Sequence, residues 1–467
     1  MYPIRPFTFA LIPTSLIAFG VVDSLFGHDR AAERPASQVE ALPVLPVGAP
    51  FFQETEDPAP AEEATAAVEV REPILKSGDQ RKLVKVILGY LEARQADKKV
   101  LDAQSDLEDT VEGLHKRLEP ETLLRNLVDF EQACLLGGAD YKDSVKGKGR
   151  VAKLDFDGVW DDTISYALHA PKAYKVKSGP WPCLLVIPDG SVDLEQTLLD
   201  DWVSTPIAEQ AVMAQIGMPA DPDSWNKRGG KGVPGGIASV LQVLREVKDS
   251  YLVDPDRTIL VGFGKGAAAA MDIAARYPHL FASVVLVSGD PGDTPATNFA
   301  NLPTYFMSGG SASTAFQEQV DELGYENCRF ESKRDLEAMW AWAMENPRKP
   351  VPGRVVYSPL ELYAGDSYWL KVDGFDLEES PHIEAQVDRE NNLIEVSGSG
   401  FFEITISFND RLVDLDRPVR VVINGTEHES EIKRSLMGMI NRFYFANDPT
   451  RLSVATARYS FSEADNE

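Results

Sequence analysis

The sequence predicts a multidomain α/β protein whose centre is a mainly parallel sheet covered by helices on both faces. Two observations favour this fold class. Between residues 150 and 350, short apolar runs alternate with amphipathic segments, which is typical of repeated strand–helix units. After residue 350, apolar and polar residues alternate and helical periodicity nearly disappears, so we expect a β-rich domain of the sandwich type.

Length and charge limit the classes of function. The 467 residues exceed what one compact domain usually holds. A formal net charge of −27 repels phosphate backbones, so no nucleic-acid partner is expected. The three cysteines form no CxxC pair, and we therefore expect neither a disulfide framework nor a metal site, and no cofactor.

The first residues have the pattern of an export signal. Arg5 precedes an apolar run over residues 7–22, which is shorter than the roughly 20 residues needed to span a bilayer. We predict a signal peptide or membrane anchor over residues 1–28, and hence a periplasmic or extracellular protein that could be tethered to a membrane. Residues 29–77 are rich in Ala, Pro and Glu, which indicates a disordered linker.

Residues 78–149 have helical periodicity. An apolar stripe over residues 83–91 predicts a first helix, residues 100–116 a second, and residues 120–138 a third that ends at Gly137 and Gly138. We expect these helices to form a small bundle or a cap on the domain that follows.

The α/β domain should span residues 150–350, and the β-rich domain residues 351–467. Strands of the α/β domain are predicted at residues 162–170, 183–187, 258–262, 283–287, 304–307 and 327–330, and its helices at 194–199, 233–250, 267–277, 316–323 and 336–344. In the β-rich domain, strands are predicted at residues 355–359, 367–372, 382–387, 393–397, 402–408, 419–423 and 452–460, with one helix at 432–445.

Several segments of the α/β domain are similar to the α/β-hydrolase superfamily. They are Val253-Asp-Pro-Asp-Arg257, Ile259-Leu-Val-Gly-Phe-Gly-Lys-Gly266, Ala274-Ala-Arg-Tyr-Pro278 and Phe281-Ala-Ser-Val-Val285. The pattern resembles feruloyl esterases, polyhydroxybutyrate depolymerases and dienelactone-hydrolase-like carboxylesterases. The resemblance covers residues 150–347, and it implies a central strand leading into the turn that carries the catalytic nucleophile.

That turn lacks the nucleophile. A nucleophile elbow needs Gly-x-Ser-x-Gly, in which the serine sits in a strained strand-to-helix reversal and the next backbone amide helps to bind the oxyanion. Here the five residues are Gly262, Phe263, Gly264, Lys265 and Gly266. Because Gly264 has no side chain, nucleophilic catalysis is impossible at this position.

The remaining catalytic positions are empty as well. Residues 308–313, in the loop where the acid belongs, contain no carboxylate, and the first histidine after the strand at 327–330 is His382. The oxyanion loop, commonly His-Gly in these enzymes, reads Pro188-Asp189-Gly190. We therefore predict a degenerate hydrolase without catalytic residues: an exported, non-catalytic binding or scaffolding protein whose partner is an unknown ligand or an extracytoplasmic protein.

Two other functions stay open. A carboxylesterase or peptidase-like serine hydrolase could use a displaced nucleophile such as Ser288 or Ser308. A dinucleotide-binding protein is the second alternative, because Gly262-x-Gly264-x-x-Ala267 matches the G-x-G-x-x-G/A fingerprint, with Asp290 about 20 residues further on. The segments flanking the fingerprint fit the hydrolase pattern better.

Charged residues are expected around the former active site. Asp189, with Gly190 beside it, and Asp290 follow neighbouring strands, at the sheet edge where α/β proteins bind ligands. Lys265 lies in the first turn of a helix, where a cation opposes the helix dipole. Our hypothesis is that the Lys265 ammonium pairs with one or both carboxylates and closes the site; a solvated lysine is the simpler alternative.

Overall fold

A computed structural model describes residues 72–116, 118, 122–159, 162–190, 192–217, 225, 229–230, 233–308 and 310–460. The predicted export signal and most of the predicted linker lie outside these residues. Within them, no helix combines the length and the apolar character needed to cross a bilayer.

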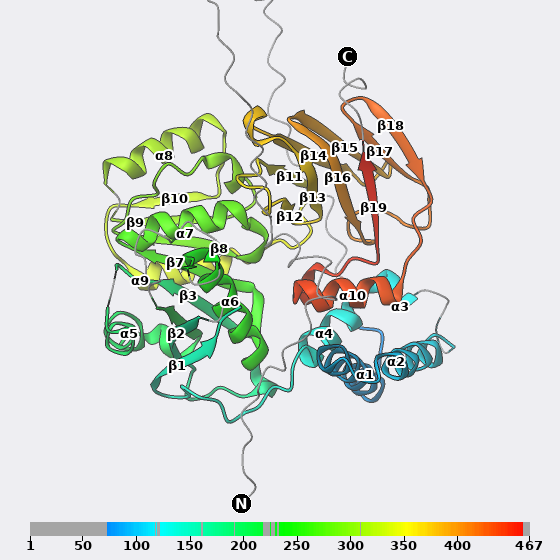
Figure 1. Cartoon of the computed structure of the whole chain (residues 1–467), viewed down its shortest axis with the longest axis horizontal. Coiled ribbons are helices and arrows are strands. Elements are labelled where there is room, and N and C mark those ends of the chain that lie inside the picture. The colour runs from blue at the N-terminus through cyan, green and yellow to red at the C-terminus, as the bar shows by residue number, and fades with distance from the viewer. Residues whose placement is uncertain are drawn as a thin grey trace, which may run out of the picture. The chain divides into compact units, whose positions relative to one another are not determined.

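An eight-stranded sheet forms the centre of the α/β domain, which confirms the predicted fold class (Figure 1). The strand order is β1-β2-β4-β3-β7-β8-β9-β10. β2 pairs antiparallel with both neighbours, and all pairs from β4 to β10 are parallel. The bounds are β1 (Val151–Asp157), β2 (Thr163–His169), β3 (Trp181–Ile187), β4 (Val212–Ile216), β7 (Val253–Phe263), β8 (Ser283–Val287), β9 (Thr304–Met307) and β10 (Cys328–Glu331).

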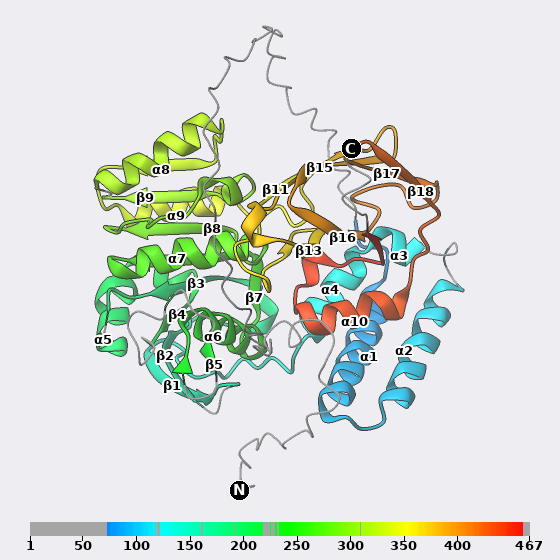
Figure 2. The same cartoon turned by 45° about the horizontal axis from the view of Figure 1, so that its top comes forward.

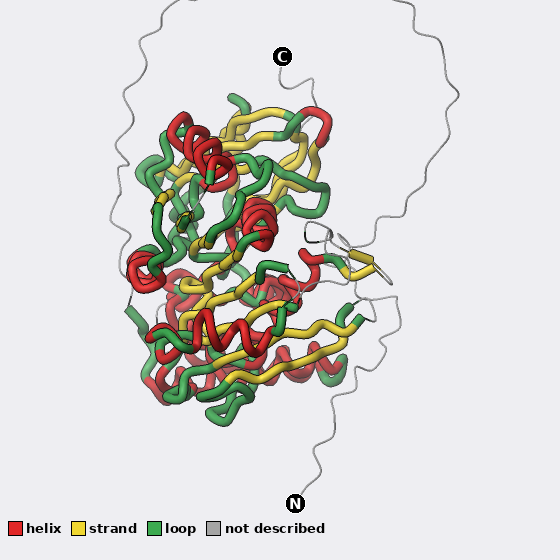
Figure 3. Tube along the Cα trace, turned by 90° about the vertical axis from the view of Figure 1, so that its left-hand side faces the viewer, coloured by secondary structure: helices red, strands yellow, loops and turns green. Residues whose placement is uncertain are grey.

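Helices cover both faces of this sheet, and every residue of β4 and β8 is buried as a result (Figures 1 and 2). One face packs against α6 (Gly236–Ser250), α7 (Lys265–Arg276) and α8 (Ser311–Glu322). The other packs against α5 (Leu194–Leu198) and α9 (Leu336–Glu345). A separate two-stranded sheet, β5 (Gly229–Gly230) with β6 (Val233–Pro234), stands outside the main sheet (Figure 3).

The second domain is built from both ends of the described chain. α1 (Ser77–Ala96), α2 (Val100–His115), α3 (Thr122–Asn126) and α4 (Val128–Gly137) lie beside α10 (Leu436–Ala446) (Figures 1 and 2). Leu83 and Phe130 from these early helices belong to the same hydrophobic core as Ile440 and Phe443 of α10. The early helices thus pack on one another, as predicted for a small bundle, and they also complete the core of the C-terminal domain.

Two sheets contribute the rest of that core. One has the order β11-β14-β15-β17-β18 and the other β12-β13-β16-β19. The bounds are β11 (Arg354–Tyr357), β12 (Asp366–Ser367), β13 (Leu370–Phe375), β14 (His382–Asp388), β15 (Leu393–Ser399), β16 (Phe401–Phe408), β17 (Val419–Ile423), β18 (Thr426–Ser430) and β19 (Ala455–Ser460).

Several elements differ from the sequence predictions. Strands β1, β4, β5, β6 and β18 were not expected, and the strand predicted at residues 367–372 is a hairpin of β12 and β13. The predicted third helix is two helices, α3 and α4. The break falls at Leu127, whose φ of 63° leaves the helical region while its side chain is buried in the core. The apolar residues keep their helical spacing through this break, so the break cannot be predicted from the spacing.

The buried guanidinium of Arg348 connects the two domains at their interface, which we call the seam. Arg348 donates from Nε to Asp256 at 2.9 Å, and from its terminal nitrogens to both oxygens of Asp448 at 2.6 and 2.9 Å. It also donates to the Thr450 hydroxyl at 2.7 Å and to the His279 carbonyl. All five N–H protons of the guanidinium therefore have acceptors. Burial alone would raise the pKa of Asp448, but Arg348 outweighs burial and the pKa is lowered.

His279, beside this guanidinium, should make the protein sensitive to acid. Burial, reinforced by Arg451 and Arg348, lowers the pKa of His279 well below its usual 6.5. The unfolded chain therefore binds a proton at His279 below about pH 6.5 while the folded chain does not, so acidification lowers the free energy of unfolding. We expect His279→Gln to lose less stability than the wild type between about pH 7.5 and pH 5, as measured by urea unfolding. Equal losses in the two proteins would contradict this.

Candidate functional site

The predicted elbow is present as a strand–turn–helix. β7 ends at Phe263, α7 starts at Lys265, and Gly264 lies between them with φ 48° and ψ −114°. A side chain is strongly disfavoured in this backbone region. The turn is also tight, because a Cβ on Gly266 would lie 2.6 Å from the carbonyl oxygens of both Ile187 and Pro188.

The carboxyl group of Asp189 fills the space above Gly264. A Cβ on Gly264 would lie 2.3 Å from Asp189 Cγ and 2.5 and 2.6 Å from its two carboxylate oxygens. Asp189 Oδ1 accepts a hydrogen bond of 3.0 Å from the backbone N–H of Lys265. In an active elbow this N–H helps to bind the oxyanion. One carboxylate thus lies where the nucleophile would stand and also occupies the oxyanion donor.

The elbow segment is also where the chain matches a protein family. Residues 222–302 match the model of the esterase PHB depolymerase family, and this stretch contains α6, β7, the elbow, α7 and β8. The matched segment sits within the mainly parallel sheet described above. The domain has an α/β-hydrolase-like fold, and we call it the hydrolase domain.

Three solved structures are similar to the hydrolase domain. A thermostable esterase is 16% identical, with 43% of this chain and 64% of that chain covered and a TM-score of 0.37. A CE1 ferulic acid esterase from Anaeromyces mucronatus is 14% identical, with 44% and 92% covered and a TM-score of 0.33. An S-formylglutathione hydrolase from Agrobacterium tumefaciens is 12% identical, with 44% and 97% covered and a TM-score of 0.35. This chain therefore covers less than two thirds of the thermostable esterase. A comparison with curated protein sequences finds no match.

The expected ion pairs of Lys265 are not formed in the hydrolase domain. Its side chain is exposed, and in the described part of the chain its ammonium has no carboxylate within 4.0 Å. Asp189 binds the Lys265 backbone amide instead, and a fixed amide at a helix N-terminus attracts a carboxylate without ordering a long side chain. Asp290 accepts a hydrogen bond of 2.7 Å from the Gly292 N–H within its own turn. Gly190, with φ 78°, lets the loop reverse after Asp189.

The displaced-nucleophile alternative gains no support at Ser288 or Ser308. Both end strands with positive φ, 51° and 54°, and neither hydroxyl hydrogen-bonds to a histidine among the described residues. A Ser–His hydrogen bond does join Ser358 Oγ to His382 Nδ1 at 3.0 Å. The backbone N–H of Ser358 is already bound by Asn298 Oδ1 at 2.7 Å, so it does not serve as an oxyanion donor. The pair lies at the end of the β11–β14 ladder, outside the hydrolase domain.

The histidine of the hydrolase sheet is also structural. His169 is buried on β2, and its two ring nitrogens lie 3.2 Å from the carbonyl oxygens of Arg150 and Ala208. Whichever ring nitrogen carries the proton has a backbone carbonyl to donate to, and His169 is far along the chain from the elbow.

Arg334 was missed by the sequence analysis. It follows β10, where the catalytic histidine belongs, and lies over the ring of Phe263 at 5.3 Å. Its guanidinium also donates to Asp201 at 3.0 Å. Phe263 in turn meets the buried indole of Trp202 edge-on, with ring centroids 5.8 Å apart. Because these residues come from three distant segments, no local pattern links them.

The helix N-terminus that would bind the pyrophosphate of a dinucleotide is already occupied. A pyrophosphate at the fingerprint would need the first amides of α7, yet the Lys265 amide already binds Asp189. A phosphate placed there would be repelled by that carboxylate. Asp290, the expected ribose ligand, is engaged in its own turn.

Proposed function

We propose that this protein is an exported pseudo-hydrolase whose α/β-hydrolase domain binds or scaffolds a partner without hydrolysing it. The observation that carries this proposal is the position of Asp189. Its carboxylate lies within 2.6 Å of where a side chain on Gly264 would begin, and it accepts the hydrogen bond of the Lys265 amide.

The groups that ester hydrolysis requires also support this proposal. Ester hydrolysis needs an activated nucleophile, a base that takes its proton, and free donors for the oxyanion. Gly264 supplies no nucleophile, and the sequence offers no histidine between His279 and His382 to act as the base after β10. Enzymes stripped of their triad keep only about 10³–10⁴-fold acceleration over water, which is far below useful turnover.

Purified wild-type protein should not hydrolyse p-nitrophenyl acetate above the background rate, and Gly264→Ser should not change this. The new serine would have no base, and its Cβ would have to displace Asp189. A serine at φ 48° should also lower the free energy of unfolding, by about 1–3 kcal/mol. Gly264→Ser combined with Asp189→Gly removes the clash and should remain inactive.

The control separates this proposal from a displaced nucleophile. A fluorophosphonate probe should not label the wild type. It should not label the variants Ser288→Ala, Ser308→Ala or Ser358→Ala either. Wild-type turnover that disappears in one of these three variants would overturn the proposal and identify the nucleophile.

Export rests on the apolar run at residues 7–22 behind Arg5. We propose that this segment directs the chain out of the cytoplasm and that residues 29–77 then act as a spacer. Fractionation of the producing cells, with sequencing of the mature N-terminus, tests this. Full-length protein confined to the cytoplasm would contradict it.

A further inference from the structure

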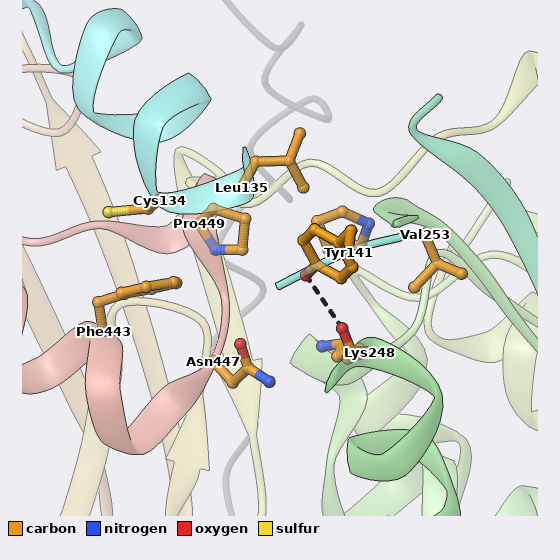
Figure 4. Close-up of a pocket in the computed structure, with 9 residues that line it drawn as sticks. Cys134, Leu135, Tyr141, Lys248, Val253, Phe443, Asn447 and Pro449 are labelled. Atoms are coloured by element: carbon orange, nitrogen blue, oxygen red, sulfur yellow. Dashed lines mark hydrogen bonds between the residues drawn. The ribbon is translucent and has the colours of Figure 1, made fainter. Parts of the chain in front are cut away.

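The cavity at the seam is too small for a ligand (Figure 4). Its volume is about 20 Å³, which is room for a water molecule. The Tyr141 hydroxyl lines it and donates a hydrogen bond of 3.0 Å to the Lys248 carbonyl, and Asn447 adds a second polar side chain. A macromolecular partner therefore needs a different surface.

Strand β1 forms the outer edge of the main sheet, where it pairs only with β2 (Figures 1 and 2). This pairing runs without a bulge from Val151 to Asp157. Just beyond it, Gly158 donates its N–H to the Asp162 carbonyl. Because backbone groups along a strand alternate in direction, residues 152, 154 and 156 turn their N–H and C=O groups towards β2 as well. Residues 151, 153, 155 and 157 turn theirs outward.

The outward backbone groups of β1 are open to a further strand. In the part of the chain that the structure describes, the Lys153 N–H alone among them has a hydrogen bond, which it donates to the Glu195 carboxylate at 3.2 Å. This bond confirms the outward direction at residue 153. Glu195 is an exposed side chain of α5, so a carbonyl from another strand can replace it. An edge strand with open N–H and C=O groups is a template for pairing with another chain.

The charges along β1 are complementary to a second copy of the same strand. Lys153 and Asp155 are exposed on one face of β1, while Leu154 is half-buried on the other. In an antiparallel pair of β1 strands with a two-fold axis at Leu154, Lys153 of each copy lies opposite Asp155 of the other. The same register brings the outward N–H and C=O groups of residues 153 and 155 together, as it does for residues 151 and 157.

We propose that two copies of this protein associate by pairing their β1 strands antiparallel about Leu154, which joins the two main sheets into one continuous sheet. Two ion pairs between Lys153 and Asp155 fix the register of this interface. A register shifted by two residues loses these pairs, because the centre moves away from Leu154. The Glu195 carboxylate competes for the Lys153 N–H and so limits the association.

Charge reversal tests this inference, with the number of copies per particle measured by light scattering during size exclusion at physiological salt. The wild type should form dimers. Lys153→Glu faces Asp155 of the other copy, and in Asp155→Lys the new lysine faces Lys153. Each variant alone should therefore raise the Kd of the dimer by about tenfold or more, since two pairs per dimer become repulsive. An equimolar mixture of the two variants restores opposite charges at both pairs and should form a mixed dimer.

Two further variants complete the experiment. Lys85→Glu, at an exposed lysine of α1, changes the net charge as Lys153→Glu does and should dimerise like the wild type. Glu195→Ala removes the competing carboxylate and should lower the Kd.

A wild type that stays a single copy at every concentration would overturn the inference. So would a dimer that neither charge reversal weakens, or a mixture of the two variants that does not associate. None of these measurements involves the elbow, so the outcome is independent of whether the hydrolase domain is inactive.

Discussion

Arg348→Ala should lower the free energy of unfolding by about 3–5 kcal/mol. The side chain is 1% exposed and that of Asp448 is 0% exposed, so the substitution leaves a buried carboxylate without its counter-ion. Asp256 and Thr450 lose a donor at the same time. The loss should appear as a lower urea midpoint with both domains affected, because the guanidinium joins them.

An exposed arginine provides the matched control. Arg420 pairs with Glu427 on the surface of the second domain, with side chains 42% and 52% exposed. Arg420→Ala should change stability far less, because water replaces the lost partner. If Arg348→Ala and Arg420→Ala had similar effects, the seam would not depend on the buried guanidinium.

Trp202→Ala should lower the free energy of unfolding by a similar amount, about 3–5 kcal/mol. The indole is fully buried and packs edge-on against Phe263 of the elbow, so its removal leaves a cavity beneath the turn. Calorimetry or urea unfolding measures the loss.

The milder variant at this position distinguishes packing from hydrogen bonding. The indole N–H of Trp202 has no acceptor among the described residues, so Trp202→Phe keeps most of the packing and sacrifices no hydrogen bond. It should therefore retain most of the stability. A loss equal to that of Trp202→Ala would show that the shape of the indole, and not its apolar volume, is required.

Local signals in the sequence predicted the centre of the fold well. Apolar runs bounded by turns predicted β8 and β9 with the bounds that the structure has. Strand β1 has no continuous apolar run; its Leu154 and Phe156 alternate with exposed charged residues, a pattern that favours a strand and was not used within the α/β domain. The joining of α1–α4 to the C-terminal sheets was missed for a different reason: it depends on contacts between distant segments, and periodicity reports only on neighbours.

The same limit applies to the candidate site. The empty nucleophile position could be predicted from Gly264 alone, and Asp189 was recognised as a candidate because it follows a neighbouring strand. Its partner was predicted wrongly, since the hydrogen bond goes to the backbone of Lys265 and not to its side chain. The sequence shows which side chains carry a charge. The direction in which a backbone N–H points depends on the conformation of the turn, which the sequence does not show.

The shared core of α1–α4 and the C-terminal sheets also has a consequence during synthesis. The early helices leave the ribosome before any of their sheet partners exist, because residues 138–354 must be made in between. At about 5–20 residues per second this interval lasts roughly 10–45 s. Throughout it, Leu83, Phe130 and their neighbours remain without the surface that finally buries them. The hydrolase domain is therefore the first part of the chain able to fold to completion.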